Sequence, residues 1–364
     1  IPWCVRKCPY CDFNSHAAGP ELPEDAYVTA LLDDLDQELA AVQGRPLSSI
    51  FFGGGTPSLF SANALGRLLR GVEQRITFAP DIEITLEANP GTFEQDKFKA
   101  YRQTGINRLS IGVQSFQPAK LEALGRIHNG DEAVRAAGMA RAAGFDNFNM
   151  DLMHGLPDQS LDDALGDLRQ AIALKPTHLS WYQLTLEPNT VFAARPPTGI
   201  PDDDASWDMQ EHCQALLADA GYAQYEVSAY AQAGRRCDHN LNYWRYGDYL
   251  GIGAGAHGKL TLGSEQDILR RWKHKHPATY MAHAGSAAAI GGEERVALDK
   301  RPFEYMLNAL RLVDGFALTE FAARTGLAPT DIAPRVDAAC KAGWLERSAD
   351  QVRPTELGRR FTND

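Results

Sequence analysis

Short strand-like runs alternate with helix-length amphipathic segments from about residue 49 to about residue 227, and this alternation constrains the fold more than any other feature. It is the pattern of repeated βα units around a parallel sheet. The expected strands are 49–52, 82–87, 108–112, 147–152, 178–184 and 224–228, and the expected helices are 63–74, 94–104, 131–143, 161–174 and 204–220. Because parallel strands open their βα loops at one edge of the sheet, we expect the side chains that follow them to converge on one site.

Three of the six cysteines, Cys4, Cys8 and Cys11, lie in a polar loop at the start of the chain. Such clustering favours a metal site over a disulfide framework. A cubane [4Fe-4S] cluster has four irons that each need an outer ligand, so three thiolates leave one iron open. Zinc with His16 as a fourth ligand is the alternative, although the spacing favours the cluster. The other three cysteines are scattered and are predicted to be structural: Cys213, Cys237 and Cys340.

Composition excludes several classes of protein. With 364 residues, 44% hydrophobic and 23% charged, the chain is long enough for one large domain and a smaller one. A formal charge of -11 argues against general attraction to nucleic acid or to an anionic membrane. No apolar run approaches the ~20 residues of a membrane span, and the first residues lack the layout of a signal peptide. The sequence therefore predicts a cytoplasmic protein.

The pattern changes in the last third of the chain. Beyond residue 301, three helices precede a short β pair, 345–346 and 351–353, as in a small winged-helix-like α+β domain. Nine Lys and Arg residues there balance nine Asp and Glu residues, which argues against nucleic-acid binding. The segment 237–258 is rich in aromatic residues and glycine, and it resembles neither a strand pair nor a clear helix. We expect three parts: a core domain, 1–230, a connecting segment, 231–300, and a C-terminal domain, 301–364.

The spacing Cys4-x3-Cys8-x2-Cys11 resembles the signature of the radical S-adenosylmethionine (SAM) superfamily, as does the tyrosine before the last cysteine. The resemblance implies a partial (β/α)6 barrel, a [4Fe-4S] cluster on the three thiolates, and SAM at the open iron. A glycine-rich turn, 53–57, follows an expected strand, where glycines let the backbone approach a ligand closely. Alone, such a turn is equally a tight connection. The resemblance assigns four residues of these two motifs to SAM: Tyr10, Gly54, Gly55 and Thr56.

Four polar residues at later strand ends also match positions that contact SAM in the superfamily: Glu87, Gln114, Arg126 and Asp151. A carboxylate accepts hydrogen bonds from ribose hydroxyls or an ammonium group, and an arginine pairs with the methionyl carboxylate. Each alone is equally a surface charge or a helix cap. Their occurrence at successive strand ends of one sheet favours a shared site.

The resemblance covers nearly the whole chain and narrows to the group of the oxygen-independent coproporphyrinogen III oxidases, which includes both the true oxidase and the HemW heme chaperones. The oxidase carries a further cysteine where this chain has Phe13, and it has an N-terminal extension that is not seen here. These departures favour the chaperone branch. We therefore predict that coproporphyrinogen dehydrogenase activity is absent.

The motif His239-Asn240-Leu241-Asn242-Tyr243 resembles the HNxxY motif that is associated with heme in the chaperone branch. The resemblance assigns His239, Asn240 and Tyr243 to heme. Nearby aromatic rings could cover a porphyrin face, although a segment of this kind also occurs simply as packing.

Together these features predict a radical SAM heme chaperone that binds a [4Fe-4S] cluster, SAM and heme and delivers heme to acceptor hemoproteins such as respiratory-chain proteins. Transient contact with membrane proteins fits this role, but no membrane segment is expected. The alternative is a coproporphyrinogen III oxidase that makes protoporphyrinogen IX. A third hypothesis, a nucleic-acid binder through the winged-helix-like end, is opposed by charge.

Overall fold

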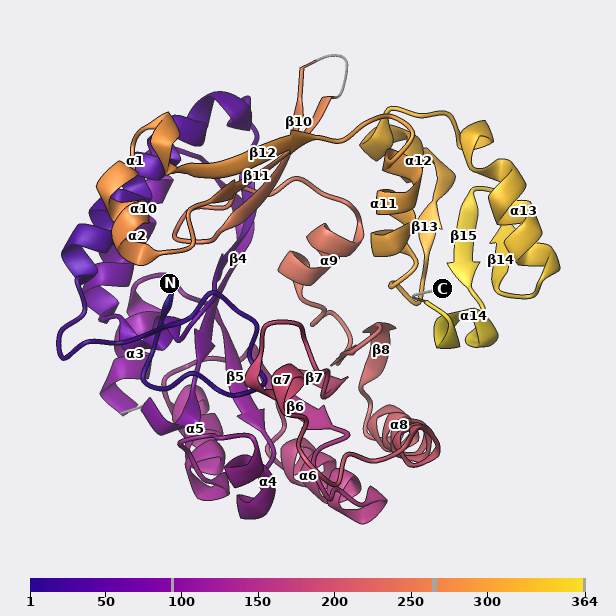
Figure 1. Ribbon diagram of the computed structural model, residues 1–364, viewed down its shortest axis with the longest axis horizontal. Helices are drawn as coiled ribbons and strands as arrows, with labels where there is room; N and C mark the ends of the chain where they lie inside the picture. Colours follow the sequence, from indigo (N-terminus) through magenta and orange to yellow (C-terminus); the bar gives the residue numbers. More distant parts are fainter. Residues whose placement is uncertain (93–94, 264–266, 363–364) are drawn as a thin grey trace.

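The computed structural model describes residues 1–92, 95–263 and 267–362 (Figure 1). A curled seven-stranded sheet forms its larger part, in the order β3-β4-β5-β6-β7-β9-β8. The first five strands are parallel, and the partial barrel that they form confirms the predicted α/β fold. The strands are β3 (Leu47–Phe52), β4 (Phe78–Ala88), β5 (Arg108–Gln114), β6 (Phe148–His154), β7 (His178–Gln183), β8 (Ala223–Glu226) and β9 (Ala229–Ala231).

Helices cover the outer face of this sheet (Figure 1). Side chains at their first residues fix several starts, because Ser61 caps α2 and capping boxes open α5 and α6. The five helices predicted between strands are confirmed to within a residue or two, except that the predicted start at Glu94 lies outside the described residues. The helices are α1 (Glu24–Val42), α2 (Ala62–Glu73), α3 (Gln95–Gln103), α4 (Pro118–Ala123), α5 (Gly130–Ala142), α6 (Leu161–Ala173), α7 (Val191–Ala194) and α8 (Asp203–Asp219).

Three features differ from the sequence prediction. The long helix α1 precedes the first expected strand and was not predicted. The last expected strand, 224–228, is not a parallel neighbour of β7, because β9 turns back and pairs antiparallel with both β7 and β8. The segment after residue 237, expected to lack a clear helix, forms helix α9 (Asp238–Trp244).

A second, antiparallel sheet follows α9 and lies beside α1. It contains β10 (His257–Leu262), β11 (Asp267–Lys273) and β12 (Ile290–Arg295), with α10 (Pro277–His283) in the β11–β12 connection. The Lys273 ammonium contacts the carboxylates of Asp34 and Glu38 on α1, each at 2.6 Å, and all three side chains are buried. These ion pairs attach the small sheet to the start of the barrel.

The C-terminal part has the predicted order of three helices and a short β pair, with an extra two-residue strand after the first helix and an extra short helix after the pair. Its sheet has the order β13-β15-β14, and its own apolar core includes Tyr305, Phe316 and Phe321. Within the described ranges, no helix combines the length and apolar character that a membrane span requires. The elements are α11 (Arg301–Ala309), β13 (Phe316–Ala317), α12 (Leu318–Thr325), α13 (Ala333–Lys341), β14 (Leu345–Ser348), β15 (Gln351–Pro354) and α14 (Glu356–Arg360).

The remaining elements are short. A two-stranded parallel pair flanks the cysteine loop at the start of the chain, and four 3₁₀ helices connect longer elements within the described ranges. They are β1 (Trp3–Cys4), β2 (His16–Ala17), η1 (Pro57–Leu59), η2 (Pro90–Thr92), η3 (Ala287–Ala289) and η4 (Pro329–Asp331).

Candidate functional site

The cysteine loop lies over one end of the barrel, between β1 and β2. Its three thiols are free, partly buried and lining a common cavity. The hydroxyl of Thr56 donates to the Cys4 sulfur at 3.3 Å, and the Arg126 guanidinium lies 3.7 Å from the Cys8 sulfur. The Thr56 contact favours the thiolate of Cys4, which is the form that binds iron, although burial outweighs it and raises the pKa of that thiol.

The glycine-rich turn after β3 packs directly on β1. The N–H groups of Gly55 and Thr56 donate to the carbonyls of Ile1 and Trp3 at 2.8 and 2.7 Å. A Cβ on Gly55 would lie 2.5 Å from the Trp3 carbonyl oxygen, and Gly54 has a φ of +113°. Close packing therefore explains why glycine is needed here, so the tight-connection alternative accounts for part of the motif. The N–H of Gly54 donates to the Glu87 carboxylate at 3.2 Å.

A cavity of about 590 Å³ inside the barrel brings the predicted SAM residues together. Residues at or near the ends of β3, β4 and β5 converge there with the cysteine loop, as expected for a parallel sheet. Two of the predicted residues are not at strand ends as expected, because Asp151 lies in the middle of β6 and Arg126 lies in the loop after α4. Gln114 reaches this position with a left-handed backbone, φ +68°, where β5 has an irregular register, and its side-chain oxygen accepts from the Tyr182 hydroxyl at 2.9 Å. The predicted residues that line the cavity are Cys4, Cys8, Tyr10, Cys11, Gly54, Gly55, Thr56, Glu87, Gln114, Arg126, Asp151 and Asn240.

Burial controls the electrostatics of this cavity. Loss of hydration, followed by the nearby charge of Asp151, raises the pKa of Glu87 to about 8. Burial also raises the pKa of Asp151, although hydrogen bonds from Ser110 and Asn149 oppose the shift. Arg126 is half-buried, and its buried Nε has no hydrogen-bond partner among the described residues. Carboxyl groups, thiols and an incompletely paired guanidinium fit a zwitterionic ligand beside an iron–sulfur cluster.

Helix α9 carries the HNxxY residues, and the structure divides them between two cavities. Asn240 lines the barrel cavity, whereas His239 and Tyr243 line a second cavity of about 550 Å³ beside β3. The His239 ring stacks on Phe51 with centroids 4.4 Å apart and meets the edge of Tyr243 at 4.9 Å. The wall between the cavities is shared, since four residues line both of them: Phe13, Phe51, Gly54 and Glu87.

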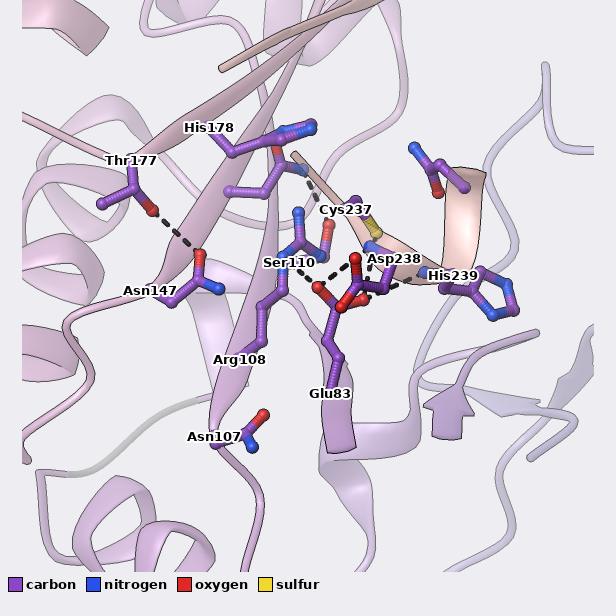
Figure 2. A network of polar contacts seen from close by, with 12 residues as sticks. Glu83, Asn107, Arg108, Ser110, Asn147, Thr177, His178, Cys237, Asp238 and His239 are labelled. Atoms are coloured by element: carbon purple, nitrogen blue, oxygen red, sulfur yellow. Dashed lines mark hydrogen bonds and ion pairs between the residues drawn. The ribbon is translucent and has the colours of Figure 1, made fainter. Parts of the chain in front are cut away.

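Figure 2 shows the contacts that hold the start of α9. The Glu83 carboxylate, from β4, accepts from the N–H groups of Asp238 and His239, each at 3.2 Å, and from the Cys237 thiol at 3.3 Å. The Arg108 guanidinium, from β5, lies 3.7 Å from the same carboxylate. A buried acid on the barrel therefore fixes the helix that carries His239, while Arg108 lines the barrel cavity.

Sequence reasoning missed this inner layer of the barrel. Neighbouring strands contribute Ser110, Asn149 and His178 to this layer. The Asn149 side chain is hydrogen-bonded to both Ser110 and His178, and the His178 ring also bonds to the Tyr225 hydroxyl at 2.8 Å. The signal that could have revealed them is alternation, because polar residues at every second strand position share one face of a sheet. In a buried sheet, such a polar face marks a lined interior.

The structure gives the zinc alternative no supporting geometry. His16 Nε2 bonds to the Asn14 side chain at 3.1 Å, and its ring meets the edge of the His276 ring. In the part of the chain that the structure describes, no three His, Cys, Asp or Glu side chains, the loop cysteines included, are placed to hold one metal ion, so this finding does not separate zinc from the cluster. The three scattered cysteines line neither cavity, in agreement with a structural role.

Comparison with known families matches two parts of the chain. The profile of the radical SAM superfamily matches residues 1–171, which contain the cysteine loop and the predicted SAM residues. The profile described as the HemN C-terminal domain matches residues 296–361.

Relatives match over the full length. "Heme chaperone HemW" of Escherichia coli (strain K12) is 55% identical over 363 residues, covering 100% of this chain and 94% of the relative. The chain belongs to the HemW family. A second HemW, from Haemophilus influenzae, is 52% identical with the same coverage. Membership of HemW, a family within the radical SAM superfamily, implies a [4Fe-4S] cluster and SAM, in agreement with the thiols and polar residues that line the barrel cavity.

A solved structure shares the HemW fold. The E. coli coproporphyrinogen III oxidase (HemN), described as a radical SAM enzyme, superposes with a TM-score of 0.82, covering 100% of this chain and 87% of the oxidase. Sequence identity between the two is 22%, so the likeness concerns the fold alone.

Proposed function

We propose that this chain is a heme chaperone that keeps its cluster and SAM in the barrel cavity and holds heme in the smaller cavity beside β3. The observation that carries the proposal is the 55% identity to HemW of E. coli along the whole chain. The two adjacent cavities support it, since one is lined by thiols and charged groups and the other by His239 and aromatic rings.

In the barrel cavity, Cys4, Cys8 and Cys11 are assigned to the cluster. When bound, the cluster supplies a redox centre with one iron left for SAM. Arg126 is assigned to the methionyl carboxylate, because its buried Nε lacks a hydrogen-bond partner. Its terminal nitrogens contact the Gly112 carbonyl and the Cys8 sulfur, which places the guanidinium beside the cysteine loop. Glu87 and Asp151 are assigned to the SAM ammonium or ribose hydroxyls.

The remaining polar positions complete the SAM site in this proposal. Tyr10, Gly54, Gly55, Thr56 and Gln114 line the cavity around the thiols and carboxyl groups. Backbone groups of the glycine turn contribute polar contacts without side-chain bulk, while the Tyr10 ring, which lies 6.4 Å from Phe192, covers an apolar side. Together they orient SAM and exclude water from it.

In the smaller cavity, His239 is assigned as a ligand of heme iron. Burial lowers the pKa of its imidazole to about 4, so the ring is neutral at physiological pH, which is the form that binds iron. Tyr243 and Tyr249, whose rings lie 4.4 Å apart, supply aromatic walls for a porphyrin. Asn240 faces the barrel cavity instead, so its proposed role is to connect the two sites rather than to contact heme.

Delivery to acceptor hemoproteins, such as respiratory-chain proteins, in the cytoplasm completes the proposed function. A heme cargo must leave the smaller cavity again, so the affinity for it is limited by the need for release. Contact with membrane-bound acceptors would be transient.

The oxidase alternative has one observation in its favour, which is the shared fold with HemN. Phe13 is exposed and lines both cavities, at the position where the resemblance to the oxidases implies a further cysteine in those enzymes. We therefore expect heme transfer to an apo-hemoprotein and no decarboxylation of coproporphyrinogen when the anaerobically reconstituted protein is assayed for both. Production of protoporphyrinogen in the presence of SAM and a reductant would replace the proposal with the alternative.

The cluster assignment has its own test. Cys4→Ala, Cys8→Ala and Cys11→Ala are each expected to lose the cluster, since two thiolates leave two irons without protein ligands. The measurement is iron and acid-labile sulfide per chain after anaerobic reconstitution. Cys340→Ala, outside both cavities, is the control and is expected to keep wild-type values. Near-normal iron and sulfide in all three loop variants, or zinc in place of iron, would contradict the assignment.

A further inference from the structure

A second imidazole shares the smaller cavity with His239. His257, the first residue of β10, lines the same space as His239 and Tyr243. No other histidine, and no cysteine or methionine, is among the described residues that line this cavity. These are the side chains, together with tyrosine, that most often bind heme iron. The cavity therefore holds two nitrogen ligands of the preferred kind, from two separate elements.

The segment before His257 packs so closely against its neighbours that Gly251 and Gly255 have no room for a side chain. A Cβ on Gly251 would lie 2.0 Å from the His257 carbonyl oxygen, and a Cβ on Gly255 would lie 2.5 Å from the Asn14 amide nitrogen. Gly253 has a φ of +110°, a left-handed conformation that side chains disfavour. The backbone that presents His257 is thus packed against its surroundings at each of these glycines.

Buried hydroxyl and carboxylate groups accept hydrogen bonds from the backbone of this segment. The N–H of Gly253 donates to the Tyr280 hydroxyl at 3.0 Å and to the Asp34 carboxylate at 3.3 Å, and the N–H of Ala254 donates to the Tyr27 hydroxyl at 2.9 Å. Asp34 is itself paired with Lys273. A cavity wall with this support holds its side chains in place before a ligand arrives, which lowers the entropic cost of binding.

Neither imidazole is committed to another partner. Within the described residues, the ring nitrogens of His239 and His257 make no hydrogen bond. The His257 ring lies roughly parallel to the Trp272 indole, with centroids 6.2 Å apart and an interplanar angle of 25°. Stacking fixes the plane of a ring while leaving its nitrogens available. The same is true of His239 against Phe51.

We propose that His257 is a second axial ligand of the heme iron, so that iron in the smaller cavity is bound by two imidazoles. The inference rests on the proposed function, because it requires heme in that cavity. Two nitrogen ligands fill both axial positions, which keeps ferric heme in the low-spin state and closed to other small ligands. Delivery then begins when one of the two imidazoles is replaced by a side chain of the acceptor.

The test is electron paramagnetic resonance of ferric heme added to the reconstituted full chain, where low-spin and high-spin iron give separate signals. Wild type is expected to be low-spin. His257→Ala is expected to bind heme in a high-spin form with at least tenfold weaker affinity, and added imidazole is expected to return the low-spin signal. His274→Ala is the matched control, since His274 lies in the neighbouring loop and does not line the cavity. It is expected to match wild type.

The outcomes separate this inference from the proposed function. If His239→Ala loses heme while His257→Ala keeps the wild-type spectrum and affinity, the second ligand is wrong and the heme site stands. A high-spin wild-type complex, or loss of the low-spin signal in Tyr243→Phe alone, would also overturn it. If wild type binds no stoichiometric heme, the proposed function itself fails. Iron and sulfide content and the midpoint of thermal unfolding, measured for every variant, identify a misfolded chain.

Discussion

Arg126 is a side chain whose hydrogen bonding is incomplete without a ligand. It donates to the Gly112 carbonyl at 2.7 Å, contacts the Cys8 sulfur, and has an unpartnered, buried Nε. Arg126→Lys keeps the charge but loses the planar fork that pairs with a carboxylate, so we expect SAM affinity to fall by about tenfold to a hundredfold. Calorimetric titration of SAM into reconstituted protein measures this. Arg135→Lys, on the exposed face of α5, is the control, and equal affinity in the two variants would remove Arg126 from the site.

His154 gives the protein a predictable sensitivity to acid. Its ring is 3% exposed, stacks on Trp181 at 3.8 Å, and burial lowers its pKa to about 4. The unfolded chain takes up this proton near pH 6.5 and the folded chain only near pH 4, so stability is present above 6.5 and falls as the pH drops through this window. For one such group the loss at pH 5 is on the order of 2 kcal/mol.

His154→Phe removes that titration while keeping a flat ring against Trp181. We expect the free energy of unfolding of this variant, measured relative to that of wild type, to increase as the pH falls from 8 to 5, because only wild type loses the stability that the neutral imidazole contributes. Urea denaturation at the two pH values measures the difference. His212→Gln, at an exposed position of α8, is the control and is expected to show no comparable change. A constant difference between His154→Phe and wild type across this range would contradict the expected coupling.

The residues that sequence reasoning found and missed differ in one physical respect. Glu87 and Gln114 were found because they lie at strand ends, and Asp151, in the middle of β6, was found because it stands in a family motif. Arg108 and His178 begin their strands and point into the barrel, where only the three-dimensional closure of the sheet makes their position distinctive. A single sequence reveals strand ends more readily than the lining of an interior.

At the scale of elements, α9 depends on a distant residue. No side chain of its own caps the first turn, and the Glu83 carboxylate fills that role from β4, 155 residues earlier than Asp238. Glu83→Gln removes the negative charge that Arg108 and the helix start share. We expect a loss of about 2–3 kcal/mol in the free energy of unfolding, because hydrogen bonds to a charged group contribute more than neutral ones. We also expect weaker heme binding, because α9 carries His239.

Hydrogen–deuterium exchange of the α9 amides, alongside urea denaturation, tests this element. Faster exchange confined to the start of α9 in Glu83→Gln is the expected result. Glu293→Gln, which breaks an exposed contact with Arg271 on the small sheet, is the control and is expected to leave α9 unchanged. Unchanged exchange in Glu83→Gln would mean that the start of α9 is stable without the Glu83 carboxylate.

The same dependence explains which elements could be predicted. Helices α5 and α6 carry their caps within four residues of sequence, so their starts were predicted to within one residue. Helix α9 has seven residues and a cap from another strand, which leaves no local signal. Helix α1 was missed because it buries Asp34 and Glu38, two acids that make its inward face resemble a solvated one. Local patterns report local interactions, and these elements are stabilised by distant ones.

For the whole molecule, one buried cation joins the barrel to the small sheet. Lys273 contacts Asp34 and Glu38, and no member of the trio is more than 3% exposed. Lys273→Met leaves Asp34 buried with hydrogen bonds but no cation and leaves Glu38 paired with Arg271 alone, so we expect the free energy of unfolding to fall by about 3–5 kcal/mol. Urea denaturation measures the loss. Lys300→Met, which breaks the exposed contact with Glu294, is expected to cost less than about 1 kcal/mol, and similar values for both variants would refute the expectation.

The half-barrel described above has two edges, and both are covered by parts of the chain that come later. Helix α9 packs against β3, at one edge. At the other, Glu226 of β8 forms an antiparallel bridge with Leu312, and the N–H of Val313 donates to the Tyr225 carbonyl at 3.0 Å. An uncovered strand edge is a template for pairing with another chain. A nascent chain that does not yet include residue 312 is therefore prone to aggregation along β8 until its C-terminal part has been synthesised and has folded. A chain truncated before residue 312 stays prone to it.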